Sequence, residues 1–183
     1  MQTITLVTGN KGKLAEWQRL FPASYRLQAV DLDLDEIQSL DLTAIATDKV
    51  KRAYASLGTP VMVEDVSAGL DNLGVLPGPF IKFFIKQLGQ DALFQLAGRE
   101  GEPATATCTI AFYDGKMLLT ATGQTKGTVT STRGENGFGC DKNFMPNGQA
   151  KTYAEMTPAE KDTVSHRSKA VTELVRQLQS HDI

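Results

Sequence analysis

The order of apolar and polar positions predicts two strands and two helices in the first third of the chain. Residues 3–7 form an apolar, β-rich run that ends in a glycine-containing turn, and a helical apolar repeat begins at Leu14. Residues 25–30 indicate a second short strand. Residues 42–57 carry apolar side chains at helical spacing, and Gly58 marks the end of that helix.

The middle of the chain is predicted to pass from a buried strand to a loop and two helices. Residues 61–65 are a short apolar run with two carboxylates at its end, where α/β sheets usually build ligand sites. Residues 66–79 are rich in Gly and Pro, which predicts an ordered loop. A helix is expected to start near residue 80, and another short helix covers residues 91–97.

The second half predicts a β-hairpin. Residues 104–113 and 116–124 contain strand-forming side chains and flank an Asp114-Gly115 turn. Residues 127–131 are expected to continue the sheet.

A glycine-rich loop and two helices follow. In residues 134–148, Phe138 and Phe144 either fill the core or cover a planar base. Thr157, followed by Pro158 and Glu160, has the marks of a helix start. The last helix is expected over residues 168–179, with Ser165 as its cap.

Composition narrows the classes of partner. The chain has 183 residues, of which 41% are hydrophobic and 22% charged, as in ordinary soluble proteins. A net charge of −2 argues against a nucleic-acid polymer as partner. The sequence shows neither a signal-peptide pattern nor an apolar run of about 20 residues, so we expect no membrane association. Cys108 and Cys140 suit a reducing cytoplasm.

The turn after the first strand is the first candidate for chemistry. A strand–turn–helix directs backbone N–H groups and the positive end of a helix dipole at one spot, which favours phosphate. The spacing of its glycines does not fit the Walker pattern, and an ordinary solvated turn is the alternative. The residues that would hold the phosphate are Thr8, Gly9, Asn10, Lys11, Gly12 and Lys13.

Adjacent carboxylates form the second candidate. Glu64 and Asp65 follow a buried run, and burying two carboxylates is costly without a cation. They are therefore either solvated at a loop or paired with lysines or a metal ion. Hard oxygen ligands of this kind suit Mg²⁺. Glu36, at the end of the acidic stretch 31–36, is placed where it can face inward.

Other cations stand in unusual places. Lys82 is the one charge in the apolar run 80–85, so it either extends to water or reaches into a cleft. His166 and Arg167 precede the last helix, a position that disfavours positive charge unless an anion is near.

Taken together, these residues resemble the inosine triphosphate pyrophosphatase family, closest to its eukaryotic-type branch. The resemblance runs from residue 3 to the last helix, and any one motif alone would be weak. Six motifs occur in the family's order. They are Thr8 to Lys13, Val63-Glu64-Asp65, Leu76 to Lys82, Gly137-Phe138-Gly139-Cys140-Asp141, Thr152 to Met156 with Ala159-Glu160-Lys161, and Ser165-His166-Arg167.

The resemblance implies an α/β fold, an elongated mixed β-sheet with flanking helices in two lobes around a central cleft. It implies that residues 1–183 form a single domain without a separate linker, and that the protein is a homodimer. The implied reaction is Mg²⁺-dependent hydrolysis of deaminated purine nucleoside triphosphates (ITP, dITP and XTP) to the monophosphate and pyrophosphate. Water would attack the α-phosphorus, with Asp65 or Glu64 accepting its proton.

The family's site residues are assigned to this chain at the positions where its motifs match. The resemblance implies that Glu36 and Asp65 hold Mg²⁺, with Glu64 beside them, and that the turn at residues 8–13 holds the triphosphate. It further implies contacts to phosphate from Lys49, Lys82 and Lys161. The implied base contacts are Phe138, Gly139, Cys140, Asp141, His166 and Arg167.

One departure concerns the base. The family usually has an aromatic residue and then Asp-Pro after Phe-Gly, whereas this chain has Cys140, Asp141 and Lys142. Two other classes stay open: a nucleotide-binding sensor without catalysis, and a house-cleaning pyrophosphatase for another modified nucleotide. Metal-dependent turnover separates the first class from the implied enzyme, and a panel of substrates separates the second.

Overall fold

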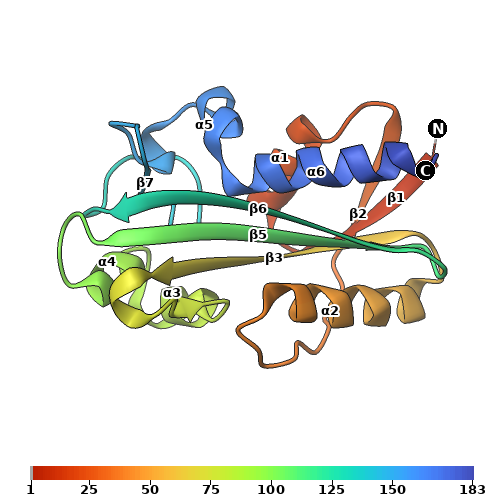
Figure 1. Ribbon diagram of the computed structural model, residues 1–183, viewed down its shortest axis with the longest axis horizontal. Coiled ribbons are helices and arrows are strands. Elements are labelled where there is room, and N and C mark those ends of the chain that lie inside the picture. Colours follow the sequence, from red (N-terminus) through yellow and green to blue (C-terminus); the bar gives the residue numbers. More distant parts are fainter. Residues whose placement is uncertain (1) are drawn as a thin grey trace. The chain divides into compact units, whose positions relative to one another are not determined.

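The computed structural model describes residues 2–183, which form a mixed α/β fold with a seven-stranded sheet and flanking helices (Figure 1). The mixed α/β class expected from the resemblance is confirmed. Two compact units make up the chain. Unit 1 holds residues up to 65, 108–123 and 167–183, and unit 2 holds residues 66–107 and 124–166. The single-domain organisation stays a prediction.

Four elements lie wholly in unit 1: β1 (Gln2–Val7), α1 (Lys11–Leu20), β2 (Tyr25–Val30) and α2 (Leu42–Leu57). Those wholly in unit 2 are β4 (Pro77–Gly78), α3 (Ile81–Leu88), α4 (Ala92–Ala97), β7 (Phe144–Pro146), α5 (Pro158–Val164) and the short 3-10 helices η1 (Asp71–Leu73) and η2 (Tyr153–Glu155). The division between units falls within β3 (Val61–Leu70), β5 (Pro103–Tyr113), β6 (Leu118–Val129) and α6 (His166–Ser180). The sheet order is β2-β1-β3-β5-β6-β7, and β4 pairs with β3.

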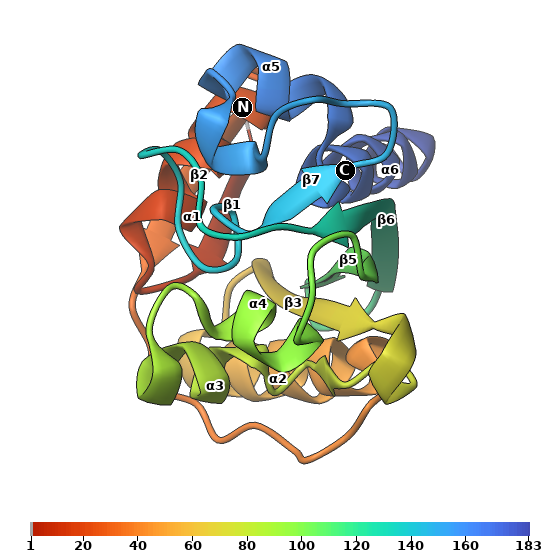
Figure 2. The same ribbon diagram turned by 90° about the vertical axis from the view of Figure 1, so that its left-hand side faces the viewer.

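In unit 1, β1 pairs in parallel with β2 and β3, with Gln2 opposite Tyr25 and Thr5 opposite Val61. Helix α2 covers one face of these strands, and α1 and α6 lie on the opposite face (Figures 1 and 2). The residues buried between α2 and the strands are small and β-branched, which lets the helix approach closely. They are Val7, Ala46, Val50, Ala53, Val61, Val63 and Ala111.

Helix α2 has the bounds that its sequence predicts, because both ends are capped. The side chain of Asp41 accepts hydrogen bonds from the Thr43 and Ala44 N–H groups, at 2.8 and 3.3 Å. At the other end Gly58 takes a left-handed conformation, with φ of 66°. The expected strand at residues 25–30 is also confirmed.

In unit 2, helices α3 and α4 lie side by side (Figure 2). A separate apolar cluster fills this unit and includes Leu70, Ile81, Leu93, Val129 and Phe144. The prediction that one of the two phenylalanines in the glycine-rich loop fills the core is confirmed, because Phe144 is buried there.

Residues 66–70 correct the prediction of a loop that starts at residue 66. They continue β3, and Ala68 and Gly69 pair antiparallel with β4. A Cβ on Gly69 would lie 2.8 Å from the carbonyl oxygen of Val75, so this glycine permits a close backbone approach within a strand. Glu64 and Asp65 consequently lie in the middle of β3, and their expected place at the end of the strand is wrong.

Two other boundaries differ from expectation. Residues 144–146, expected in a loop, form β7, which pairs antiparallel with residues 127–129. The last helix begins at His166 rather than at Ser168, and Ser165 is the C-cap of α5, which ends at Val164. Among residues 2–183, no helix is both long enough and apolar enough to cross a lipid bilayer.

Candidate active site

The turn between β1 and α1 has the geometry expected of an anion site. Asn10 caps the helix: its side-chain oxygen accepts a hydrogen bond from the Lys13 N–H at 3.0 Å. The Thr8 hydroxyl oxygen accepts from the Asn10 N–H at 3.2 Å. The first turn of α1 carries no acidic residue, so no carboxylate of its own neutralises the positive end of the helix.

Gly9 and the two lysines of this turn have different surroundings. A Cβ on Gly9 would lie 2.5 Å from a carboxylate oxygen of Asp31, so a side chain here would require the exposed Asp31 side chain to move. Lys11 is exposed. Lys13 is half-buried, and its ammonium lies 3.1 Å from the Glu64 carboxylate. The structure therefore joins the predicted phosphate turn to one of the predicted carboxylates.

Glu64 is buried and surrounded by donors from two helices. The Trp17 indole N–H donates to its Oε2 at 2.7 Å. Arg167 donates from Nε to Oε2 and from Nη2 to Oε1, at 2.9 Å each. Burial alone would raise the pKa of Glu64, but Arg167 and Lys13 hold it below its ordinary value. Glu64 is thus a fixed anion whose oxygens are already occupied.

The sequence did not single out two of the residues in this network. Glu16 is buried on α1, and its carboxylate accepts from Nη1 of Arg167. Trp17 was predicted only as part of an apolar face. The available signal was spacing, because Glu16 follows Lys13 by three positions and lies on the same side of the helix. Arg167, predicted as a base contact, is 2% exposed and holds both glutamates.

Asp65 belongs to a different network within unit 1. The Lys49 ammonium donates to Glu36 Oε1 at 2.6 Å and lies 3.3 and 3.4 Å from the two Asp65 oxygens. The structure therefore brings the two predicted metal ligands onto one lysine. Burial raises the pKa of Asp65, and neighbouring Glu36 adds to this, against the lowering effect of Lys49. Burial opposes the charge of Lys49, but Asp65 and Glu36 together raise its pKa.

The donor set fits a hard divalent cation. Two carboxylates converge on one positive charge, which is the arrangement that Mg²⁺ uses when substrate phosphates and water complete its coordination. Within residues 2–183 there is no group of three or more His, Cys, Asp or Glu side chains suited to a metal ion.

In unit 2, the predicted residue Asp141 contacts two other predicted residues, Phe138 and Lys161. This carboxylate is buried; it accepts from the Phe138 N–H at 2.8 Å and from the Lys161 ammonium at 2.6 Å. The Lys161 ammonium also lies 5.1 Å from the centre of the Phe138 ring. Asp141 and Lys161 thus form a buried ion pair, and the ammonium of that pair lies close to the ring of Phe138.

Tyr153 extends this cluster, although sequence reasoning gave it no role. Its ring centre is 5.2 Å from the Lys161 ammonium and 5.8 Å from the ring of His166. His166 is buried at the start of α6. The predicted Lys161 and His166 are therefore both near Tyr153.

Three other predicted residues of unit 2 have different surroundings. Gly139 has φ of 64°, a conformation that favours glycine. Cys140 packs against the apolar cluster of the unit, and burial raises the pKa of its thiol. Lys82 is exposed on α3, with its ammonium 5.1 Å from the Phe83 ring.

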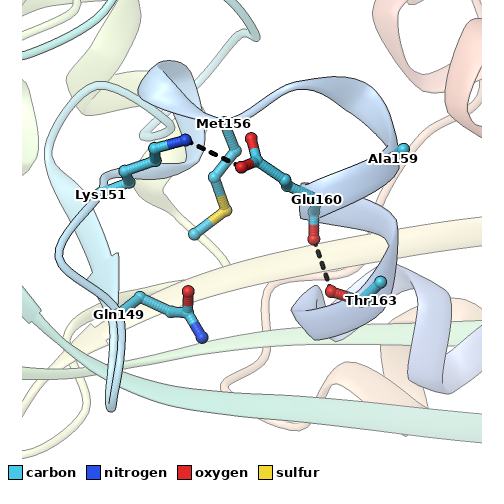
Figure 3. A pocket seen from close by; sticks show the side chains of 6 residues that line it. All are labelled: Gln149, Lys151, Met156, Ala159, Glu160 and Thr163. Carbon is cyan, nitrogen blue, oxygen red and sulfur yellow. Dashed lines mark hydrogen bonds and ion pairs between the residues drawn. The ribbon is translucent and has the colours of Figure 1, made fainter.

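A separate pocket of about 360 Å³ lies beside α5 (Figure 3). An ion pair between Lys151 and Glu160, at 2.8 Å, lies on one side of it. None of the predicted site residues lines it. Its lining consists of Gln149, Lys151, Met156, Ala159, Glu160 and Thr163.

Comparison with known proteins gives consistent results. The model of the Ham1 family matches residues 4–177. An inosine triphosphate pyrophosphatase from Emericella nidulans is 42% identical over 177 residues, covering 95% of each chain. The structure of a HAM1 protein from Coxiella burnetii has a TM-score of 0.82 and 26% identity, covering 98% of this chain and all of that one. A nucleoside-triphosphatase (dITP/XTP pyrophosphatase) from Mycobacterium abscessus has a TM-score of 0.72 and 27% identity, covering 94% and 98%.

Proposed function

The chain belongs to the Ham1 family, and from this premise we propose that it hydrolyses deaminated purine nucleoside triphosphates to the monophosphate and pyrophosphate. ITP, dITP and XTP are the proposed substrates. The names of the relatives support this choice, since one acts on inosine triphosphate and another on dITP and XTP. The resulting role is to remove deaminated purines from the nucleotide pool.

The observation that carries the proposal is the contrast between two adjacent carboxylates. Glu64 accepts hydrogen bonds from Trp17 and Arg167, so its oxygens are committed. Asp65, the next residue of β3, contacts the ammonium of Lys49, which also contacts Glu36. Burial raises the pKa of Asp65, and Lys49 acts against this shift. We therefore assign the general base to Asp65 and a fixed structural charge to Glu64.

Mg²⁺ is the proposed cofactor, and Glu36 and Asp65 would hold it. When bound, the ion neutralises charge on the phosphates, which hydrolysis of a phosphoanhydride requires more than covalent help. The chain's own residues position the substrate and the water. Asp65 accepts a proton from the water that attacks the α-phosphorus, and the pyrophosphate departs.

Unit 1 supplies cations and N–H groups for the triphosphate. The turn at residues 8–13 offers the open N-terminus of α1, and Lys11 is exposed beside it. Lys13 and Lys49 add positive charge near Glu64 and Asp65. Lys82 and Lys161 stay predicted phosphate contacts.

Unit 2 supplies the proposed base site. Phe138 would stack on the purine, and Asp141, fixed by Lys161, would bind its polar edge. A 6-oxo group accepts hydrogen bonds, so a donor from His166 would favour hypoxanthine, whereas the amino group of adenine would leave that donor unpaired. A contact from Arg167 would have to come from the guanidinium that already holds Glu64 and Glu16.

Two further properties are proposed from the resemblance. The protein would be a homodimer, which light scattering coupled to gel filtration tests directly. It would act in the cytoplasm. The state of its cysteines agrees with that compartment, because Cys108 and Cys140 are both free thiols.

A substrate panel tests the proposed function. The protein would be incubated with Mg²⁺ and ITP, ATP or GTP in parallel, and the products followed by phosphorus NMR. We expect pyrophosphate and inosine monophosphate from ITP, with ATP and GTP spared. Release of pyrophosphate from all three nucleotides would contradict the proposed selectivity for the base. Tight nucleotide binding without turnover would instead support the sensor.

A further inference from the structure

Lys49 occupies the centre of the proposed metal site. Its ammonium lies 2.6 Å from a Glu36 oxygen and 3.3 Å from an Asp65 oxygen. The side chains of Lys49 and Asp65 are largely shielded from water, with exposed fractions of 15% and 14%, whereas that of Glu36 is 27% exposed. The same carboxylates that would bind a divalent cation are thus already bridged by a positive charge of the chain.

The Lys49 ammonium offsets the repulsion between the carboxylates of Glu36 and Asp65. Two carboxylates that share a partly buried site repel each other, and the repulsion is relieved only by a cation between them or by a proton. Lys49 supplies that cation from α2 without any bound ion. A divalent ion that binds the same oxygens must replace this interaction, because two positive charges at one pair of carboxylates repel each other.

We propose that Lys49 is a resident counter-ion that competes with the divalent cation for Glu36 and Asp65. Its ammonium stabilises the metal-free protein and is released from the pair when the ion binds. This inference rests on the proposed function for the identity of the metal site. A lysine suits the task because its ammonium is a compact charge on a flexible stem and can find a new partner, such as a phosphate, once displaced.

The consequence is that Lys49 lowers the affinity of the protein for the divalent cation. In the absence of nucleotide, the released ammonium has no phosphate to pair with, so metal binding carries the full cost of breaking the bridge. With nucleotide present, that cost is smaller. Lys49 would thereby make binding of the cation depend on binding of the substrate, which is a coupling between two ligands.

The test is a calorimetric titration of nucleotide-free protein with Mg²⁺ alone, at mildly alkaline pH. We expect Lys49→Met to bind Mg²⁺ about tenfold more tightly than the wild type, and Lys49→Arg to stay close to the wild type. The matched control is Lys51→Met, which removes the same charge from an exposed position of α2 and should leave the affinity unchanged. An affinity for Lys49→Met equal to or weaker than that of the wild type would overturn the proposal.

Thermal unfolding gives a second readout that does not depend on turnover. Without metal, Lys49→Met should melt at a lower temperature than the wild type, and Mg²⁺ should recover more of its stability than it adds to the wild type. If Lys49→Met does not fold, Lys49→Gln should show the same two changes. An unaltered melting temperature in metal-free buffer for a variant lacking this charge would contradict the resident counter-ion.

The outcomes separate this inference from the proposed function. Hydrolysis of ITP by the wild type, together with an unchanged Mg²⁺ affinity in Lys49→Met, would leave the function standing and remove the counter-ion. Tighter Mg²⁺ binding in Lys49→Met without hydrolysis of ITP by the wild type would support the counter-ion and remove the function.

Discussion

Arg167 holds both carboxylate oxygens of Glu64, with Nε donating to Oε2 and Nη2 to Oε1 at 2.9 Å each. Asp65, one position along β3, points to the opposite side of the strand, because successive side chains alternate. Its cation is Lys49, from a different helix. Two adjacent acidic residues therefore have separate environments, one suited to hold structure and the other to take part in chemistry.

Replacing Glu64 with Gln should destabilise the protein strongly. The change leaves the buried Arg167 without its full counter-charge, and breaking a buried pair in this way costs about 3–5 kcal/mol. Urea denaturation measures the loss. Glu173→Gln on the exposed side of α6 is the control, with an expected change of no more than about 0.5 kcal/mol. A similarly small change for Glu64→Gln would contradict the role assigned to Glu64.

The same carboxylate should make stability depend on pH. The pKa of Glu64 is lowered in the folded protein, so the unfolded chain takes up a proton first, near the ordinary value of about 4.3. The contribution of Glu64 is then complete above that pH and declines as the pH falls below it. The stability gap between the wild type and Glu64→Gln should narrow over this acidic range. A gap that stays constant there would argue against a lowered pKa.

Asp65→Asn should reduce kcat by about 10²–10⁴-fold, because it removes the proposed proton acceptor. The fold should be retained, since the amide keeps the size of the side chain. Steady-state kinetics with ITP and a thermal melt measure both effects. Asp48→Asn serves as the control, because Asp48 pairs with Arg52 on the surface of α2. Full activity in Asp65→Asn would exclude Asp65 as the base.

Trp17→Phe should lower the free energy of unfolding by about 1–3 kcal/mol. The ring of Phe fills most of the same buried space, but the indole N–H that donates to Glu64 at 2.7 Å is lost. Denaturant titration of the two proteins gives the difference. Equal stability would mean that Arg167 and Lys13 satisfy Glu64 without the indole.

Asp141→Asn should destabilise unit 2 by about 3 kcal/mol and raise the KM for ITP. Lys161 is buried and would lose the negative charge that it contacts at 2.6 Å. Glu135→Gln is the matched control, since Glu135 lies in the same loop with its side chain 95% exposed. Melting curves and KM values for both variants test the assignment. A KM unchanged in Asp141→Asn would remove Asp141 from the proposed base site.

Much of the local structure could be predicted from the sequence. The capped helix at residues 42–57 and the strand at residues 25–30 have the expected bounds, because caps and periodicity are local signals. The loop predicted from residue 66 was wrong, since Gly69 indicated a loop but permits a close backbone approach within a strand. β7 was missed because its three residues carry too short a pattern.

The members of the candidate site were proposed from motifs, whereas their contacts could not be predicted. The motifs named Glu64 and Arg167, yet these residues lie 103 positions apart, and their pairing depends on the tertiary fold. Trp17 lies 47 positions from Glu64, and nothing in its apolar repeat indicated a donor to a carboxylate. Sequence reasoning therefore left Asp65 and Glu64 as equal candidates for the base, and the hydrogen bonds that occupy Glu64 support the proposal of Asp65.

Hydrolysis of ITP in water enriched with ¹⁸O identifies the phosphorus that water attacks, because the label stays on that phosphorus. Mass spectrometry of the products gives the answer from a single turnover. Attack at the α-phosphorus predicts one ¹⁸O atom in inosine monophosphate and none in pyrophosphate. Label in pyrophosphate or in orthophosphate, or no turnover of ITP at all, would contradict attack at the α-phosphorus.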